Sequence, residues 1–243
     1  MTVILLVAGL NAPAIGSHDA PISGFTSGSM QAGSMKVGSM LAGSMLATSA
    51  RTEPDTSGDK LIVLFFGDSI TAGYGLDPDS AFPALIQERA DSLGWPVEVV
   101  NAGVSGETSA GGLRRVDWIL RRPFDIFVLE LGGNDGLRGI DPENTLKNLQ
   151  QIIDQVRSEH PDVHIVLTGM EAPPNMGENY IREFRQIYQN LAASNDVTFM
   201  PFILEDVAGE PELNQADGIH PTGQGHRIIA ENVWQVLEPL LKP

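Results

Sequence analysis

Alternating apolar and amphipathic segments organise the chain from Lys60 onwards. Five short segments are almost continuously apolar, rich in β-branched or aromatic residues and bounded by turn residues, which is typical of strands buried on both faces of a sheet. These segments are residues 61–66, 97–101, 125–131, 163–169 and 197–202. Between and after them, apolar residues recur at helical spacing, at about residues 80–93, 109–121, 142–159, 178–194 and 222–241.

The alternation of strand and helix predicts an α/β fold in which all strands run in the same direction. Right-handed crossovers between parallel strands place helices on both faces of the sheet. We therefore expect a flavodoxin-like three-layer sandwich built on a five-stranded parallel sheet, with ligands bound at the carboxyl edge of the strands.

The first 59 residues have a different texture from the rest of the chain. A five-residue unit is repeated four times within residues 28–47, as GSMQA, GSMKV, GSMLA and GSMLA, and it has no sustained period of 2 or 3.6 that would bury one face. We therefore divide the chain into a low-complexity leader, residues 1–59, predicted to be disordered or partly a signal segment that is removed, and a folded domain, residues 60–243.

A signal-like segment begins inside this leader, at Met35. Lys36 supplies a positive charge, an apolar stretch follows, and the small residues 47–50 resemble a cleavage site. This pattern predicts a periplasmic or secreted protein. The alternative is a plain flexible tail, with which a cytoplasmic location stays open.

Charge and composition remove several classes of partner and cofactor. The net charge of −16 should repel nucleic acid phosphates, and no apolar run approaches the ~20 residues of a transmembrane helix. The absence of cysteine excludes disulfides and thiolate sites, and the five histidines show no convincing metal-ligand spacing. We therefore expect no nucleic acid partner, no transmembrane segment, no metal and no cofactor.

Polar residues gather where the first three predicted strands end. Ser69 follows the first strand in the sequence GDSIT, at the edge where ligands bind. Gly106 lies in a glycine-containing loop whose backbone N–H groups can point at an anion, and Asn134 supplies an amide donor in GGNDG. Each has an ordinary alternative, namely a helix N-cap for the serine and a plain turn for the other two.

A second group of polar residues precedes the last predicted helix. Asp217 and His220 lie three residues apart in DGIHP, so that the carboxylate can face the ring N–H and select the tautomer, while Pro221 is placed to begin the helix. A solvated loop is the common alternative. Asp68 and Asp135 are expected to bond loop backbone rather than to act as further acids.

Together, GDSIT, SGETS, GGND and DGIHP resemble, in this order, the four conserved blocks of the SGNH (GDSL) hydrolase family. The resemblance covers essentially residues 61–243. The segments NAGVSGETSAGGL and ELGGNDGLRG are similar to the bacterial thioesterase, lysophospholipase and arylesterase branch. Two departures are that Ile70-Thr71 replaces the frequent Leu-Ser and that the leader has no counterpart.

The resemblance implies a serine esterase that forms an acyl-enzyme. Ser69 would be the nucleophile, His220 the general base and Asp217 its orienting carboxylate, with the oxyanion held by the N–H groups of Ser69 and Gly106 and by the Asn134 amide. The implied substrate is a small-molecule carboxylic ester of short-to-medium acyl chain, with thioesters and lysophospholipids as further candidates. Alternatives are a carbohydrate acetylesterase of the same fold and a non-catalytic ligand-binding domain.

The segment after the fourth predicted strand is expected to border the acyl group, because it leaves that strand at the carboxyl edge. The residues predicted to bind substrate there are Met170, Ala172, Pro173, Met176 and Tyr180. The alternative is a surface turn whose methionines fill the core. Oligomeric state and source are not readable from the sequence.

Overall fold

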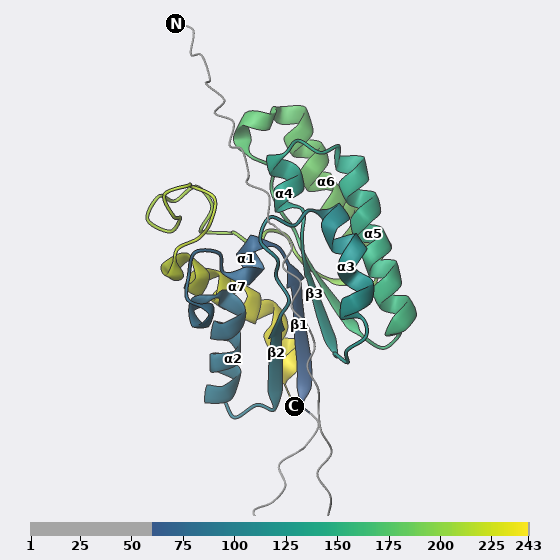
Figure 1. Ribbon diagram of the computed structural model, residues 1–243, viewed down its shortest axis with the longest axis vertical. Coiled ribbons are helices and arrows are strands. Elements are labelled where there is room, and N and C mark those ends of the chain that lie inside the picture. Colours follow the sequence, from purple (N-terminus) through teal and green to yellow (C-terminus); the bar gives the residue numbers. More distant parts are fainter. Residues whose placement is uncertain (1–59, 243) are drawn as a thin grey trace, which may run out of the picture. The chain divides into compact units, whose positions relative to one another are not determined.

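A single parallel sheet forms the centre of the protein, as seen in the computed structural model, which describes residues 60–242 (Figure 1). The sheet has five strands in the order β2-β1-β3-β4-β5. Their bounds are β1 (Leu61–Gly67), β2 (Val97–Asn101), β3 (Ile126–Glu130), β4 (His164–Thr168) and β5 (Thr198–Met200). The predicted flavodoxin-like strand order and direction are confirmed. The predicted leader lies outside the described residues, and the division of the chain at residue 60 stays a prediction.

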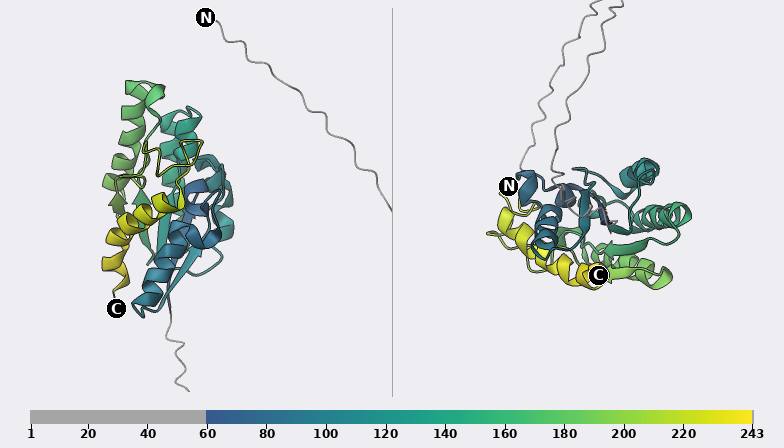
Figure 2. Two further views of the ribbon diagram at one scale, coloured as in Figure 1. Left: turned by 90° about the vertical axis from the view of Figure 1, so that its left-hand side faces the viewer. Right: turned by 90° about the horizontal axis from the view of Figure 1, so that it is seen from below.

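Helices cover both faces of the sheet. α2 (Phe82–Ser92) packs on α7 (Gly223–Leu241) on one face, whereas α3 (Ser109–Ile119), α5 (Pro142–Glu159) and α6 (Glu178–Ser194) lie side by side on the other (Figures 1 and 2). This arrangement follows from the right-handed crossovers, since the connection from β1 to β2 runs in the opposite direction across the sheet from all later ones.

The core is built from the central strands, whose apolar runs are buried on both sides. Residues Val63–Gly67 of β1 and the whole of β3 are buried. Glu130, the last residue of β3, has a side chain with no exposed surface, although it is the one charged residue of that strand. A buried carboxyl is costly unless it is neutral or well bonded, which makes its position unusual.

Several short elements were not predicted from the hydrophobic pattern of the sequence. These are α1 (Ser69–Ala72), α4 (Gly133–Leu137) and the 3-10 turns η1 (Pro78–Ser80) and η2 (Pro174–Met176). One helical turn is too short to display a 3.6-residue period, so such elements carry no sequence signal.

The expected start of the last helix at Pro221 was wrong. α7 begins at Gly223 because the Thr222 hydroxyl accepts a hydrogen bond from the Gly225 N–H and caps the helix.

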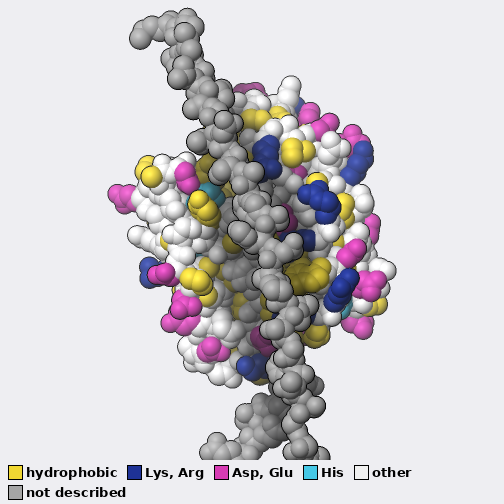
Figure 3. All heavy atoms as spheres, viewed as in Figure 1, with side chains coloured by type: hydrophobic (Ala, Val, Ile, Leu, Met, Phe, Trp, Pro, Cys, Tyr) yellow, Lys and Arg dark blue, Asp and Glu magenta, His cyan; other side chains and the backbone are white. Residues whose placement is uncertain are grey.

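The surface agrees with the acidic composition. On the face drawn in Figure 3, acidic side chains are distributed around the outline, with basic side chains standing among them. Among residues 60–242, no helix is long and apolar enough to cross a membrane.

The strand order also determines where polar residues can meet. The chain leaves β1 toward β2 on one side and returns to β3 on the other, and ligands bind at such a reversal, beyond the carboxyl ends of the strands. α1 follows β1 and α4 begins three residues after the last residue of β3. Figure 1 shows both short helices at the same end of the sheet, which brings Ser69 and Asn134 to one edge.

Candidate active site

Three of the predicted residues form one hydrogen-bonded chain. The Ser69 Oγ lies 3.0 Å from His220 Nε2, and His220 Nδ1 lies 2.6 Å from Asp217 Oδ2. Ser69 is brought to this point by β1, while Asp217 and His220 arrive 148 and 151 residues later in the loop before α7. The structure therefore places the imidazole where it can accept the serine proton, with the carboxylate on its far side to orient the ring.

The carboxylate of Asp217 is held by its own loop. Asp217 Oδ1 accepts hydrogen bonds from the backbone N–H groups of Ile219 and His220, at 2.9 and 3.0 Å. The hydrogen bonds from the His220 side chain and from these N–H groups lower the pKa of Asp217 to about 2. An ionised carboxylate accepts a hydrogen bond from Nδ1–H, so the proton stays on Nδ1 and the Nε2 lone pair faces the serine hydroxyl.

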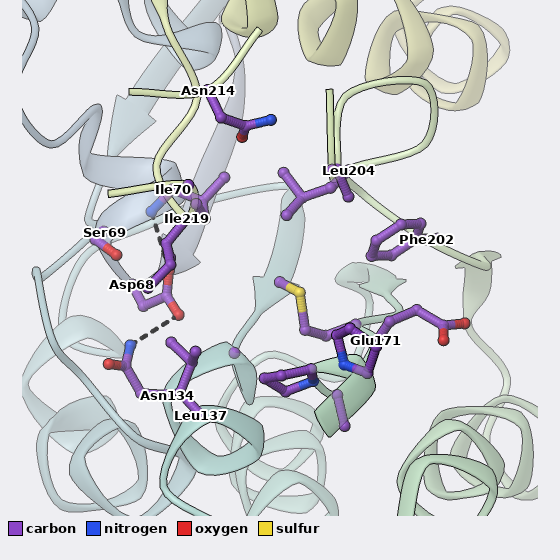
Figure 4. Close-up of a pocket in the computed structure, with 18 residues that line it drawn as sticks. Asp68, Ser69, Ile70, Asn134, Leu137, Glu171, Phe202, Leu204, Asn214 and Ile219 are labelled. Atoms are coloured by element: carbon purple, nitrogen blue, oxygen red, sulfur yellow. Dashed lines mark hydrogen bonds between the residues drawn. The ribbon is translucent and has the colours of Figure 1, made fainter. Parts of the chain in front are cut away.

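Ser69 is the first residue of α1, and its hydroxyl is free of any capping task. The helix is capped by Asp68, whose Oδ1 accepts from the Ile70 N–H at 3.0 Å. The alternative interpretation of Ser69 as an N-cap is therefore wrong. Asp68 was expected to bond loop backbone, but the backbone group that it bonds belongs to α1, and its Oδ2 also accepts a hydrogen bond from the Asn134 Nδ2 at 3.1 Å (Figure 4).

Asn134 lies on α4, which follows a glycine turn. Gly132 has a φ of 117°, and a Cβ at this position would lie 2.0 Å from the Tyr188 Oη. Only glycine fits both the left-handed backbone and the tyrosine. Asp135 accepts hydrogen bonds from the Ser109 N–H and from the Ser109 and Thr145 hydroxyls, so this buried carboxylate joins α4 to α3 and α5.

The loop after β2 carries Gly106 and packs closely on α1. At Gly103 a Cβ would lie 2.4 Å from the Ala72 nitrogen, so the two backbones approach at a distance that only glycine permits. The Gly106 carbonyl accepts a hydrogen bond from the Arg138 guanidinium at 3.0 Å, directly after α4. The loop of Gly106 and the helix of Asn134 are thereby tied together.

Arg115 was not singled out from the sequence, yet it supports the same edge. Its guanidinium pairs with Glu107 and donates to the carbonyls of Gly67 and Ala102, at 3.3 and 2.8 Å. It therefore links the end of β1 to the loop after β2. A lone arginine at a helical position has no pattern that would have revealed this role.

Glu130 was also missed, although a glutamate inside an apolar strand segment is a visible signal. Its Oε2 accepts from the Asp68 N–H at 3.2 Å and from the Thr71 hydroxyl at 2.7 Å. Burial, followed by the neighbouring charge of Asp68, raises the pKa of Glu130 well above its ordinary value. Burial likewise raises the pKa of Asp68 to about 6, against the opposing hydrogen bonds from Ile70 and Asn134.

An apolar cavity of about 590 Å³ opens beside Ser69 (Figure 4). Three of the residues predicted to bind substrate line it, namely Met170, Ala172 and Pro173. Several other lining residues, which were not predicted from the sequence, come from α4, the loop after β5 and the loop that carries His220: Leu137, Phe202, Leu204 and Ile219. Its size is within the usual range for small-molecule sites.

Two residues predicted for this lining are not among its members. Tyr180 is directed instead to the segment after α4, where its hydroxyl donates to the Ile140 carbonyl at 2.7 Å and its ring stacks on Phe184. Met176 ends the 3-10 turn η2, beyond the part of the loop that borders the cavity.

Among the described residues, no group of three or more histidine or carboxylate side chains is arranged to hold a metal ion.

Comparison with known proteins agrees with this geometry. Residues 65–228 match the GDSL-like lipase/acylhydrolase family model. Esterase TesA of Pseudomonas aeruginosa is 43% identical over 74% of this chain and 89% of its own length. Thioesterase 1/protease 1/lysophospholipase L1 of Escherichia coli K12 is 39% identical over 76% of this chain and 86% of its own. A crystal structure of TesA superposes with a TM-score of 0.71 and 42% identity, covering 74% of this chain and 99% of that one.

The family match covers more than half of the chain and includes Ser69, Gly106, Asn134, Asp217 and His220. The resemblance stated for GDSIT, SGETS, GGND and DGIHP is thereby confirmed. The chain belongs to the GDSL-like lipase/acylhydrolase family and is an ester hydrolase.

Proposed function

We propose that the protein hydrolyses carboxylic esters of short-to-medium acyl chains through an acyl-enzyme on Ser69. The observation that supports this most directly is the 3.0 Å separation of Ser69 Oγ and His220 Nε2, with Asp217 bonded to the far side of the imidazole. Nucleophile, base and orienting group within hydrogen-bond reach are the signature of covalent acyl transfer.

In the first half of the reaction, Ser69 Oγ bonds to the acyl carbon while its proton passes to His220 Nε2. The carbonyl oxygen takes the negative charge of the tetrahedral intermediate. When the intermediate collapses, His220 returns the proton to the departing alcohol or thiol, and the acyl group stays on Ser69. Asp217 remains ionised throughout and stabilises the imidazolium.

In the second half, a water molecule attacks the acyl-enzyme while His220 again accepts a proton. Collapse of the second intermediate returns that proton to Ser69 and releases the carboxylic acid. The oxyanion in both halves is held by the Ser69 and Gly106 N–H groups and by the Asn134 amide. Removal of one such donor typically lowers turnover by ~10²–10³-fold.

The acyl chain occupies the cavity beside Ser69. Its lining includes the apolar side chains of Leu137, Met170 and Ile219, which suit an alkyl chain. Relatives named as an esterase and as a thioesterase and lysophospholipase support acyl esters as the substrate class. Because the acyl group is common to all three substrate classes, thioesters and lysophospholipids are further substrates to test.

Replacement of the nucleophile tests the mechanism. We expect Ser69→Ala to abolish hydrolysis of p-nitrophenyl butyrate with an unchanged melting temperature, since loss of the nucleophile costs ~10⁴–10⁶-fold in turnover. A fluorophosphonate should label the wild type once, at Ser69, as read by peptide mass spectrometry. Ser158→Ala, a change at an exposed position of α5, serves as the control. Labelling at another residue would refute the assignment.

A substrate screen separates this function from its alternatives. We expect turnover of p-nitrophenyl esters from acetate to octanoate, with no further gain for longer chains. Activity on acetylated xylan without activity on butyrate or octanoate would indicate a carbohydrate acetylesterase. Absence of both turnover and phosphonate labelling would indicate a ligand-binding domain.

We further propose that the enzyme works in the periplasm or outside the cell. The support is the signal-like segment that begins at Met35, with its single positive charge at Lys36 and the small residues at 47–50. Fractionation of cells that express the full chain, with N-terminal sequencing of the product, tests this. Retention of an uncleaved chain in the cytoplasm would contradict it.

A further inference from the structure

Asp68 and Asn134 form a hydrogen bond that takes no part in the catalytic steps of the proposed reaction. The Asp68 Oδ2 accepts a hydrogen bond from the Asn134 Nδ2 at 3.1 Å, and both residues line the cavity with Ser69 (Figure 4). The Asp68 side chain comes from the end of β1 and is only 1% exposed. This buried carboxylate therefore influences how the side-chain amide of Asn134, on α4, is oriented.

Asp68 is itself held both through its carboxylate and through its backbone. Its Oδ1 accepts from the Ile70 N–H at 3.0 Å, and its backbone N–H donates to the buried Glu130 Oε2. The same Glu130 oxygen accepts from the Thr71 hydroxyl at 2.7 Å. Rotation of the carboxylate would break the helix cap, so Oδ2 remains directed at Asn134.

A carboxylate oxygen can only accept hydrogen bonds, and this decides how the neighbouring amide is turned. The side-chain amide of asparagine has an oxygen on one side and an NH₂ group on the other, and an ionised Asp68 accepts only the NH₂. One N–H of Asn134 is used by Asp68. The second N–H of the same nitrogen is then left for a ligand beside Ser69.

We propose that Asp68 is a positioning residue that selects the amide orientation in which Asn134 donates to the oxyanion. This inference rests on the proposed function, because it presupposes the oxyanion role of Asn134. Without Asp68, the amide can turn over and present its carbonyl oxygen to the developing negative charge. Such an orientation removes a donor and adds repulsion.

Asp68→Asn is the variant that tests the proposal, because asparagine still caps α1 through its Oδ1. Its NH₂ group then faces Asn134, two donors meet, and the Asn134 amide must turn over. We expect kcat for p-nitrophenyl butyrate to fall by about 10²-fold, with KM changed by less than about threefold, as for the loss of one oxyanion donor. Asp117→Asn, at an exposed position of α3, removes the same charge elsewhere and should leave kcat unchanged.

A double-mutant cycle distinguishes positioning from a general structural role. If Asp68 acts through Asn134, Asp68→Asn should cost less than about threefold in a protein that already carries Asn134→Ala. If Asp68 instead supports the fold or the nucleophile, the two losses should multiply, and the proposal is overturned. An unchanged kcat in Asp68→Asn alone would overturn it as well.

The same double-mutant cycle distinguishes a failure of the positioning role of Asp68 from a failure of the proposed oxyanion role of Asn134. A normal kcat in Asn134→Ala would contradict the oxyanion role of Asn134, whereas a loss there that multiplies with Asp68→Asn would contradict only the positioning role. Should Asp68→Asn have a lowered melting temperature, Asp68→Ser repeats the cycle. Serine caps helices but is too short to reach Asn134, so the same two outcomes decide the question.

Discussion

Two carboxyl groups that support the serine and its histidine have opposite electrostatic surroundings. Asp217, with 40% of its side chain exposed, receives three hydrogen bonds, which lower its pKa to about 2. Glu130 has no exposed surface, and burial raises its pKa well above the ordinary value. The hydrogen bonds therefore favour the ionised form of Asp217, which is able to stabilise an imidazolium. Burial favours the protonated form of Glu130, which orders the backbone behind Ser69.

This assignment predicts that Glu130→Gln retains turnover, because glutamine has the shape and charge of the protonated acid. We expect kcat within about threefold of wild type, whereas Glu130→Ala should lose about 1–3 kcal/mol of unfolding free energy by leaving the Asp68 N–H without its partner. Urea denaturation and p-nitrophenyl butyrate turnover measure the two effects.

The same substitution has a consequence for the pH dependence of stability. The unfolded chain releases the Glu130 proton near the ordinary pKa of 4.5, whereas the native protein retains it. The contribution of Glu130 is therefore fully present below that value and is lost as the pH rises toward the raised native pKa. The stability of the wild type relative to Glu130→Gln should fall as the pH rises from 4 to 8. A constant difference would mean that the pKa of Glu130 is not raised in the native protein.

Tyr74 is the candidate for contacts with the leaving group. Its ring, 51% exposed, lies 4.5 Å from the imidazole of His220 between centroids, and it is not part of the cavity lining. His220 protonates the leaving group, so an aryl group would depart beside this ring. We expect Tyr74→Ala to lower kcat/KM for phenyl butyrate by about 2- to 10-fold relative to ethyl butyrate. Equal losses on both esters would show that Tyr74 acts on His220 and not on the leaving group.

At the scale of elements, the loops at one edge of the sheet divide the work. The segments after β1 and before α7 carry the groups of the proposed proton transfer, and the segments after β2 and β3 carry two of the three proposed oxyanion donors. The loop between β4 and α6 contributes an apolar wall made of Met170, Ala172, Pro173 and Pro174. Because this wall belongs to one loop, acyl preference can change without disturbance of the catalytic groups.

A bulky residue in this wall should shorten the acyl preference. Ala172 is 7% exposed and lines the cavity, so the indole of Ala172→Trp would occupy space used by the distal part of the chain. We expect the ratio of kcat/KM for octanoate to that for acetate to fall by about tenfold, which corresponds to two methylenes at ~0.8 kcal/mol each. Met176→Trp, a change in the same loop but outside the lining, is the matched control. Equal chain-length profiles in both variants would place the acyl chain elsewhere.

At the scale of the whole molecule, the two helices on one face are joined by a buried histidine. His226 of α7 is 1% exposed, and its Nδ1 accepts a hydrogen bond from the Phe82 N–H, the first of α2. No side chain of the preceding residue caps that helix, so the imidazole takes this task from across the face. Only a neutral ring can accept here, and burial lowers the pKa of His226 to about 4.

This histidine should make the protein sensitive to acid. Above the ordinary pKa of 6.5 its contribution to stability is fully present, and as the pH falls the unfolded chain takes up a proton that the native protein refuses until about pH 4. We expect the unfolding free energy of the wild type, relative to His226→Asn, to fall by about 3 kcal/mol between pH 7 and pH 4. Asparagine is the suitable reference because its Oδ1 can accept from Phe82 without titrating. A difference that does not vary with pH would contradict the buried neutral state.

The sequence alone determined the order of the elements and the polar residues at their ends. Apolar runs of five to seven residues are typical of strands that are buried on both faces. Their alternation with amphipathic helices then indicates parallel strands. From this it followed that Ser69, Asn134 and His220 lie at one edge, although each motif alone was ambiguous.

The tertiary structure decided what each side chain faces once it reaches that edge. Whether Met176 borders the cavity, how Asp68 meets Asn134 and why the pKa of Glu130 is raised all depend on atoms from strands and loops more than 30 residues apart in the chain. Periodicity reports which face of a segment is buried, but loop direction and pKa are set by long-range contacts. Such contacts leave no local pattern, because the partner of a polar group can lie anywhere in the chain.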